Sequence, residues 1–446
     1  MGFQYRVWVI AVVVGVMASM SSVAVGQEQQ ERGDKHEGSG VVSETGDTLW
    51  RLSGRIRPRI ETRFNHHFGL GDGEIGRSNH PDEAGLITQQ SRLNIGFEHD
   101  SLSGRLTLQH TAQWGAFGGA SLTIPPIGVY EARLRHEATE SVAVDVGRFE
   151  LAYGDENVLG SVGWSQVGRT WDGLRVDMRP GESWDIDAFV TRHNAGGVSV
   201  GQGDAYLAGV YSTVEEPFGA VVSAADLYLL YDLQFGGGAT VEDEEDVASV
   251  EGQQLWMLGT RWAARWAGLD LTAEGAFQTG TYCPGPSVGL SCEVDAGEIR
   301  GYFADGEMGY EVAGLRPFVG GSYASGDDPD TAEIREAYQP MYPTGHAVLG
   351  FMDIIGPRTN LIELRGGLEA SFAMFNAVLA AHGFRQVEPS GGLGAEFNLK
   401  VFADVTDSIQ IGGGHGVYVP GSALSATDNV PEGVANWSFV QTVGRF

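Results

Sequence analysis

The chain has 446 residues, a formal net charge of −30 and only two lysines, Lys35 and Lys400, so nearly all of its positive charge is arginine. We expect no nucleic-acid partner for so acidic a chain. It exceeds one ordinary globular domain in length, yet no Pro-rich or Ser-rich linker divides it. After residue 26 no window holds 18 consecutive apolar residues, which excludes a hydrophobic transmembrane helix.

Residues 1–26 have the pattern of a secretory signal peptide. Arg6 precedes the mostly apolar run 7–17, and small residues, Ala24-Val25-Gly26, follow it. A charged start, an apolar centre and a small-residue cleavage site predict export and cleavage before Gln27. Residues 27–49 are polar, with few large apolar groups, and we expect a disordered lead-in there.

The stretch RLSGRIRPRIETRF, residues 51–64, alternates apolar residues at even positions with arginines at odd positions. A helix would also align Arg51, Arg55, Arg59 and Arg63, but Arg57 breaks that stripe and Pro58 disrupts a helix interior. The alternation therefore predicts a β-strand. Pro58 cannot donate a ladder hydrogen bond, so a bulge or a missing bond is expected there.

The same alternation continues along the chain. It recurs in SRLNIGFEHD (91–100), GRLTLQHTAQWG (104–115), VYEARLRHEA (129–138), DGLRVDMRP (172–180) and SWDIDAFVT (183–191), and more weakly near the carboxyl end. Acidic loops interrupt the pattern, most clearly at residues 240–254 and 323–340. No convincing helix and no fixed-period repeat is found, so the chain is predicted to be all-β.

Alternating strands fit a soluble sandwich or propeller, or a membrane barrel whose apolar residues face lipid. Segments of about ten residues suit tilted spanning strands, and the mature chain could supply roughly 16–18 of them. An arginine on the lipid face near the midplane would cost about 2–4 kcal/mol. We therefore predict a large antiparallel transmembrane barrel over residues 50–446, with Arg55, Arg57, Arg59 and Arg63 facing the lumen.

Several segments resemble the alginate-export family of outer-membrane porins. The most specific is GRFELAYGDENVLGSVGWSQVGRTWDGLRVDM, residues 147–178. The opening RLSGRIRPRIE, the QQSRLNIGFEHD segment, residues 342–367 and the closing strands are similar to the family as well. The resemblance covers nearly all of residues 50–446.

This resemblance implies a monomeric barrel in the outer membrane of a Gram-negative-type bacterium, with a narrow arginine-lined channel. It also implies passive export of an acidic polysaccharide, with periplasmic secretion proteins as possible partners. The terminal Phe446 resembles the signal that barrel-assembly machinery reads. The positions that match the family motifs are Arg57, Arg59, Arg92, Arg148, Asp155, Trp164, Arg169, Asp172 and Arg175.

A row of arginines suits a polyuronate, because guanidinium binds carboxylate in a bidentate manner that lysine cannot reproduce. Alternatively, the same arginines serve as struts paired with acidic residues of the wall. The predicted lumen path comprises Arg55, Arg57, Arg59, Arg63, Arg92, Arg105, Arg133, Arg135, Arg148, Asp155, Arg169, Asp172 and Arg175. The sequence leaves both roles open for each of these residues.

In residues 147–155, the strand alternation and the predicted lumen position of Arg148 disagree. The alternation of Val142, Val144 and Val146 would place Arg148 on the outer face, so a β-bulge is expected before this segment. The segment that follows either folds into the pore and narrows it or forms a tight external turn.

The remaining candidates point to no chemistry. Cys283 and Cys292 are separated by eight residues and are predicted to form a structural disulfide. The GDDPD stretch (326–330) lacks the pattern of a calcium loop. Asn65-His66-His67, and Ser165 with His193, have neither metal-ligand spacing nor a nucleophile elbow. We therefore predict no metal, no cofactor and no enzymatic activity.

The sequence thus predicts a passive outer-membrane channel that exports an anionic polysaccharide. Its partners would be that polyanion, outer-membrane lipid and the assembly machinery. A general uptake porin for small anions or sugars is the alternative, and a barrel enzyme or surface adhesin is a more distant one.

Overall fold

The computed structural model describes residues 40–64, 83–114, 127–194, 204–219, 221–235, 252–283, 287–288, 291–292, 296–331, 333–346, 348–423 and 433–446. The predicted signal peptide lies outside these residues. Within the described ranges, no helix has the length and apolar character needed to cross a membrane. The predicted lead-in ends earlier than residue 49, because residues 41–45 already form a strand whose backbone pairs with its neighbour.

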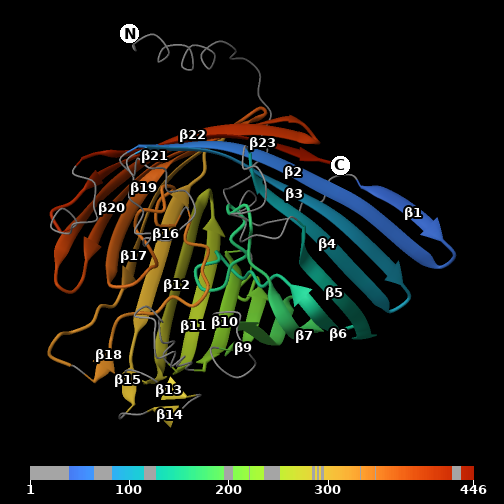
Figure 1. Cartoon of the computed structure of the whole chain (residues 1–446), viewed down its shortest axis with the longest axis horizontal. Helices are drawn as coiled ribbons and strands as arrows, with labels where there is room; N and C mark the ends of the chain where they lie inside the picture. The colour runs from blue at the N-terminus through green and yellow to red at the C-terminus, as the bar shows by residue number, and fades with distance from the viewer. Residues whose placement is uncertain are drawn as a thin grey trace, which may run out of the picture.

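Eighteen strands form one closed antiparallel barrel (Figure 1). They are β2 (Thr48–Phe64), β3 (Glu83–His99), β4 (Leu102–Gln113), β5 (Gly128–Thr139), β6 (Val142–Phe149), β7 (Trp171–Gly181), β8 (Trp184–Asn194), β9 (Asp204–Glu215), β10 (Val222–Gln234), β11 (Gln253–Trp266), β12 (Leu269–Tyr282), β16 (Tyr302–Tyr310), β17 (Leu315–Ala324), β19 (Leu361–Phe372), β20 (Phe375–Gln386), β21 (Gly391–Thr406), β22 (Ile409–Pro420) and β23 (Ala435–Arg445). Each pairs with its neighbours in sequence, and β2 pairs with β23 to close the sheet. The predicted number of strands is confirmed.

Five short strands lie outside this wall. They are β1 (Val41–Thr45), β13 (Ser287–Val288), β14 (Ser291–Cys292), β15 (Gly297–Ile299) and β18 (Ile334–Arg335). β1 extends the sheet along the first residues of β2, and β15 pairs with β18 in parallel. These additions leave the antiparallel order of the wall unchanged.

The two ends of the barrel differ in the length of their connections. At one end, here called the short-turn end, neighbouring strands are joined by as few as two residues, as between β3 and β4 or β11 and β12. At the other, the long-loop end, the connections after β6 and β17 span residues 150–170 and 325–360. The last strand, β23, also finishes at the short-turn end, where Phe446 exchanges backbone hydrogen bonds with Gly54.

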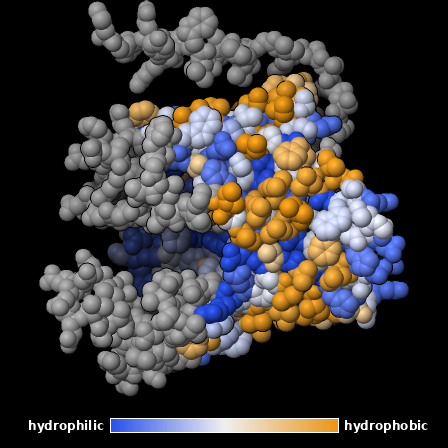
Figure 2. Space-filling view, turned by 45° about the vertical axis from the view of Figure 1, so that its right-hand side comes forward, coloured by the Kyte–Doolittle hydropathy of each residue, from blue (hydrophilic) through white to orange (hydrophobic). Residues whose placement is uncertain are grey.

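The side chains of each strand alternate between two different surroundings. On β2, Ile56 and Ile60 are about half exposed on the outside, whereas Arg57, Arg59 and Glu61 are buried on the inside. The outer face carries a belt of exposed aliphatic residues, part of which Figure 2 shows in orange. Its members include Ile60, Leu134, Val146, Leu174, Val190, Val210, Leu229, Leu258, Leu271, Val319, Leu364, Leu379, Leu399, Ile411 and Val440.

Exposed aromatic residues border this belt at both ends of the barrel. Trp50, Trp184, Trp266 and Tyr310 lie near the short-turn end, and Phe64, Trp114, Trp256 and Tyr302 lie near the long-loop end. Two aromatic girdles around an apolar band are the arrangement of a barrel that spans a membrane.

Pro58 interrupts the ladder only at the seam where the barrel closes. Its pairing with β3 is continuous, and Pro58 lies opposite Gln89. On the other side, the pairing with β23 passes from Ile56 to Arg59 without including Arg57 and Pro58, while the register stays the same. As expected, the ladder lacks pairing at Pro58 on this side. No bulge accompanies the gap, because the loss of one N–H donor does not require an extra residue.

The outer belt predicts that the cost of an outward-facing arginine depends on its depth in the membrane. Leu229→Arg, in the middle of β10, should lower the free energy of unfolding by about 2–4 kcal/mol because it places a guanidinium in hydrocarbon. Val221→Arg, in the β9–β10 turn, should cost about 0–1 kcal/mol. Reversible unfolding in lipid vesicles measures both values, and equal costs at the two positions would contradict the assignment of the belt.

Candidate functional site

Two long connections enter the barrel and cross its interior. We call residues 150–170, between β6 and β7, the first inserted segment, and residues 325–360, between β17 and β19, the second inserted segment. The first contacts inward-facing side chains on distant walls: Asp155 binds Arg261 on β11, and the carbonyl of Ser165 accepts a hydrogen bond from Arg57 on β2 at 2.6 Å. Contacts with strands on opposite sides are possible only inside the lumen.

The two inserted segments hold each other in place. Leu159 and Tyr342 form a parallel bridge, in which the amide of Gly160 donates to the carbonyl of Tyr342 at 2.9 Å and the amide of Tyr342 donates to the carbonyl of Val158 at 3.0 Å. The amide of Thr344 donates to the carbonyl of Glu156 at 2.9 Å. This pairing satisfies backbone groups that would otherwise be unpaired away from water.

Apolar side chains also attach both segments to the wall. Leu151, Val158 and Leu159 pack with buried residues of β7 to β17, such as Tyr228 and Met257. The second inserted segment packs Leu349, Phe351 and Met352 against β17 to β23. At the turn that carries them, Gly350 has φ of 90°, and the Glu396 carboxylate accepts hydrogen bonds from the amides of Phe351 and Met352 at 2.6 and 3.0 Å. The inserted segments are therefore fixed parts of the interior.

Arg57 and Arg59 anchor the first inserted segment to β2. Arg57 donates to the carbonyls of Gly163 at 2.8 Å and Ser165 at 2.6 Å, and to the side chain of Gln166 at 3.1 Å. Arg59 donates to the carbonyl of Trp164 at 2.5 Å, and its guanidinium lies 3.8 Å from the centre of the Trp164 ring. Both arginines are almost fully buried, so their guanidinium groups bind the protein's own backbone.

Backbone strain occurs beside this anchor. Val162 has φ of 55°, a left-handed conformation that is costly for a β-branched residue. Its amide donates to the Thr344 hydroxyl of the second inserted segment at 3.0 Å. The contacts on both sides of Val162 hold it in that conformation.

Four further motif residues, Asp155, Arg169, Trp164 and Arg92, have similar structural roles. Arg261 forms a bidentate ion pair with Asp155 at 2.8 and 2.5 Å. Arg169 donates to the carbonyls of Gly160, Tyr342 and Pro343, and burial lowers the pKa of its guanidinium from the usual value.

The other two stack on aromatic or imidazole rings. The Trp164 ring stacks on His346 with centroids 4.4 Å apart. Arg92 lies 3.5 Å above the Tyr130 ring and donates to Gln109 at 2.7 Å.

A second group of arginines belongs to a charge network on β5 to β8. The fully buried Asp145 carboxylate accepts hydrogen bonds from Arg133 at 3.2 Å, Arg135 at 2.9 Å and Arg175 at 2.7 Å. Arg135 also binds Asp177 at 2.7 Å. Glu137, 2.7 Å from Arg135, and Asp187, 3.9 Å from Arg175, also belong to this network, so acidic partners balance its arginines.

Arg148 and Asp172 are not brought into the lumen. They lie opposite each other on β6 and β7, on the same face as the exposed Val146 and Leu174, and form a bidentate ion pair at 2.7 and 2.6 Å. The expected bulge before this segment is absent, since the pairing of β6 with β7 runs without a shift from Val142 to Phe149. Uninterrupted alternation therefore keeps Arg148 on the outer face.

The remaining predicted arginines of β2 face inward. Arg55 donates to the Gln90 side chain at 2.6 Å, and Arg63 pairs with Glu61 at 3.0 Å. Both are partly accessible from the interior.

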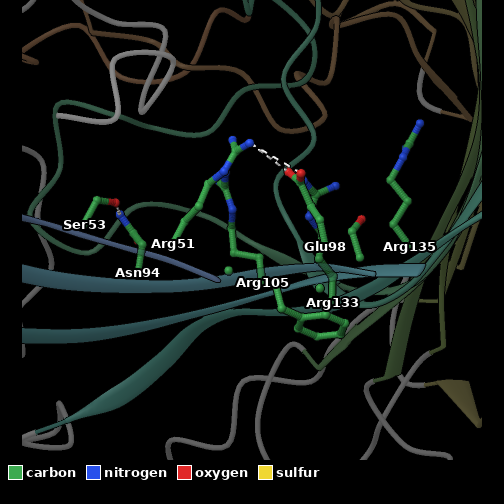
Figure 3. Close-up of a pocket in the computed structure, with 11 residues that line it drawn as sticks. Arg51, Ser53, Asn94, Glu98, Arg105, Arg133 and Arg135 are labelled. Carbon is green, nitrogen blue, oxygen red and sulfur yellow. Dashed lines mark hydrogen bonds and ion pairs between the residues drawn. The ribbon is translucent and has the colours of Figure 1, made fainter. Parts of the chain in front are cut away.

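A cavity lies at the short-turn end of the interior, on the wall formed by β2 to β5. Arg51, Arg105, Arg133 and Arg135 line it, together with Ser53, Asn94 and Glu98; we call these four arginines the mouth arginines. Figure 3 shows Arg51, Glu98 and Arg135 rising from the same face of the strands. Arg51 and Glu98 pair at 3.3 Å and are each about half exposed.

Two of the mouth arginines, Arg51 and Arg105, are paired less tightly than the anchors. Arg105 is 3.7 Å from Glu131, and it lies directly opposite Arg133 in the β4–β5 pairing. Like charges directly opposite each other destabilise a sheet. Arg51 was not among the residues predicted to line the lumen. It occupies an odd position of the alternating stretch, as Arg55 and Arg57 do, and this pattern was sufficient to include it.

The other candidates show no catalytic arrangement within the described residues. Asp327 accepts hydrogen bonds from the amides of Glu336 and Ala337, so this carboxylate caps a loop. The Ser165 hydroxyl accepts from the amide of Val167. Asn65-His66-His67 and the His193 side chain lie outside the described residues. Cys283 is disulfide-bonded, and the side chain of its predicted partner, Cys292, lies outside those described.

Comparisons with known proteins give a family and a fold. The profile of the family described as Alginate export matches residues 134–415, more than half of the chain. No curated protein sequence matches the chain. Among solved structures, *Acinetobacter baumannii* OccAB1 is similar with a TM-score of 0.58 and 10% identity, over 93% of this chain and 99% of that one.

*Pseudomonas aeruginosa* OccK9 (OpdG) matches equally well, with a TM-score of 0.58 and 10% identity, over 89% of this chain and 98% of that one. The outer membrane protein opdK from *Pseudomonas aeruginosa* has a TM-score of 0.55 and 9% identity, over 89% of this chain and 98% of that one. At this level of identity, the likeness supports the barrel fold alone.

The anchor makes a prediction that separates Arg57 from Arg51 on the same strand face. Arg57→Ala should free the first inserted segment and give a larger, noisier single-channel conductance, because charge-assisted hydrogen bonds worth about 1.5–3 kcal/mol each are lost. Arg51→Ala removes a charge without touching that segment and should leave the current noise unchanged. Unchanged noise in Arg57→Ala would contradict the anchoring role.

Proposed function

The chain belongs to the alginate export family and forms an outer-membrane channel, and we propose that this channel exports an anionic polysaccharide of the polyuronate type. The short-turn end of an outer-membrane barrel faces the periplasm. The mouth arginines would therefore be the first groups that an outgoing chain meets.

The observation that carries this proposal is the pairing of Arg105 with Arg133 across β4 and β5. Two like charges side by side cost stability, which Glu131, 3.7 Å from Arg105, and Asp145, 3.2 Å from Arg133, offset through long contacts. Such long contacts favour a role in ligand binding beside the one in folding. A carboxylate between them would relieve the repulsion and accept bidentate hydrogen bonds. Arg51 and Arg135, which line the same cavity, extend the positive surface around it.

The mouth arginines would attract a polyanion at the periplasmic entry, since they line the cavity there. Conduction requires several weak sites and not one deep site, and the partial exposure of the mouth arginines fits weak binding.

A channel for small anions or sugars is the second candidate. The inserted segments cross the interior and pack against both walls, which narrows the route and favours a small solute. A polyuronate could pass only as a single extended chain. Block of the current by oligouronates distinguishes the two functions.

We propose further that the barrel is a monomer without enzymatic activity. Closure of β2 on β23 within one chain supports a complete pore in each molecule. The exposed Phe446 ring at the end of β23 supports recognition by the barrel-assembly machinery.

The mouth arginines should determine ion selectivity. Wild-type channels in a salt gradient should prefer anions, and each of Arg51→Gln and Arg105→Gln should lower the anion-to-cation permeability ratio about tenfold, since one unit charge at 6 Å in water stabilises an anion and destabilises a cation by roughly 0.7 kcal/mol each. Both variants should also weaken the block by oligouronates. The measurement is the reversal potential of the current.

Arg148→Gln, on the outer face, is the matched control and should leave the permeability ratio unchanged. Cation selectivity in the wild type would contradict the proposal. Anion selectivity without any block by oligouronates would favour the small-solute channel.

A further inference from the structure

The strand β1 leaves one edge of the sheet open at the short-turn end. It pairs with residues 48–52 of β2 in an unbroken antiparallel register, and within the described residues it pairs with no other strand. β23, which pairs with β2 from Arg55 onward, ends where Phe446 exchanges backbone hydrogen bonds with Gly54. β1 therefore continues the position of β23 past the end of the closed wall, and Figure 1 shows it projecting beyond the C-terminus.

The open edge of β1 lies outside the hydrocarbon of the membrane. The unpaired side of a strand carries N–H and C=O groups that lipid cannot satisfy. The exposed Trp50, which lies opposite Ser43 of β1, belongs to the aromatic girdle at the short-turn end. Since the short-turn end of an outer-membrane barrel faces the periplasm, the open edge is accessible to periplasmic proteins.

This edge lacks the features that prevent a strand from pairing with another chain. Residues 41–47 contain no proline and no lysine, and the pairing of β1 with β2 has no bulge. All five residues of β1 are exposed, and Val41 and Val42 expose 65% and 58% of their surface. Backbone groups of a strand point alternately to its two sides, so at least two of these residues present an N–H and a C=O group to the open side.

The surroundings of the open edge are acidic. Residues 41–53 and 96–102, which form β1, the start of β2 and the turn after β3, contain four carboxylates and one arginine, namely Glu44, Asp47, Glu98, Asp100 and Arg51. With His99 neutral, these groups give this end of the sheet a net charge of −3. A segment that carries lysine or arginine would be attracted here, whereas the same edge of a second copy, with the same charge, would be repelled.

We propose that the open edge of β1 binds an extended, positively charged segment of a periplasmic protein as an added strand. Main-chain hydrogen bonds provide the affinity, and lysine or arginine side chains beside Glu44 provide the selectivity. Val42 of β1 lies opposite Arg51, so the added strand lies two strand positions from Arg51, at the entrance of the cavity. This binding site goes beyond the proposed function and does not depend on which solute passes through the channel.

Binding of a synthetic peptide to the full mature chain in detergent micelles tests this site. The probe is a short, dye-labelled peptide that alternates valine with lysine. One comparison peptide has glutamate in place of lysine, and the other is N-methylated at every amide, which removes its backbone donors and keeps its charge. Fluorescence anisotropy should show that the lysine peptide binds about tenfold more tightly than either comparison peptide. Amide hydrogen exchange within residues 41–45 should slow when it binds.

Three variants separate the charge from the backbone edge. Glu44→Lys should weaken the binding of the lysine peptide about tenfold and strengthen that of the glutamate peptide. Val42→Pro removes one N–H group from β1 and should weaken the binding of both. Glu182→Lys makes the same change of charge in the β7–β8 turn, at the same end of the barrel, and should change neither. Heat-modifiable migration on gels confirms that each variant is folded.

Four results would overturn the proposal. Equal binding of the three peptides by the wild type would remove the evidence for strand addition, as would unchanged exchange in residues 41–45 when the lysine peptide is bound. An effect of Glu182→Lys as large as that of Glu44→Lys would indicate a general response to net charge. A dimer of the wild type in native mass spectra, lost in Val42→Pro, would assign the edge to a second copy of this chain.

Discussion

Backbone hydrogen bonding in a medium without water governs this structure. Lipid cannot satisfy an N–H or C=O group, so a sheet that spans it must close on itself, and here β2 closes on β23. Closure fixes the alternation of each strand, which sends Ile56 and Ile60 outward and Arg57 and Arg59 inward. The same requirement applies to the inserted segments. Their carbonyl groups need donors inside the barrel, and buried arginines supply several of them.

The arginines of one chain thus have three different roles. Arg57, Arg59 and Arg169 donate to backbone carbonyls and hold the inserted segments. Others converge on Asp145 and strengthen the wall. Arg51 and Arg105 remain partly accessible beside a cavity. One interpretation of the sequence was a uniform ladder of substrate sites, and the structure differs from it. Arginines of equal parity on one strand have different roles because an inserted segment lies against some of them and not against others.

Local pattern was enough to predict the barrel but not the partners of its inward residues. Alternation of period two gave the strands, the inward face of residues 51–64 and the gap at Pro58. The contacts of Arg57 with residues 163–166 join segments more than 100 positions apart, and no local pattern reports such contacts. Arg148 was misplaced because family likeness suggested a bulge, whereas the plain alternation of Val142, Val144 and Val146 gave the correct face.

The most direct test of whether the mouth arginines recognise a polyanion is to compare the block of the channel current by an oligouronate added to each side of the membrane. Channels inserted in one orientation in a planar bilayer would receive a short oligouronate on one side at a time. Recognition at the periplasmic mouth predicts block at a lower concentration from the short-turn side, and a weaker block from that side in Arg105→Gln. Equal block from both sides, or stronger block from the long-loop side, would contradict the account.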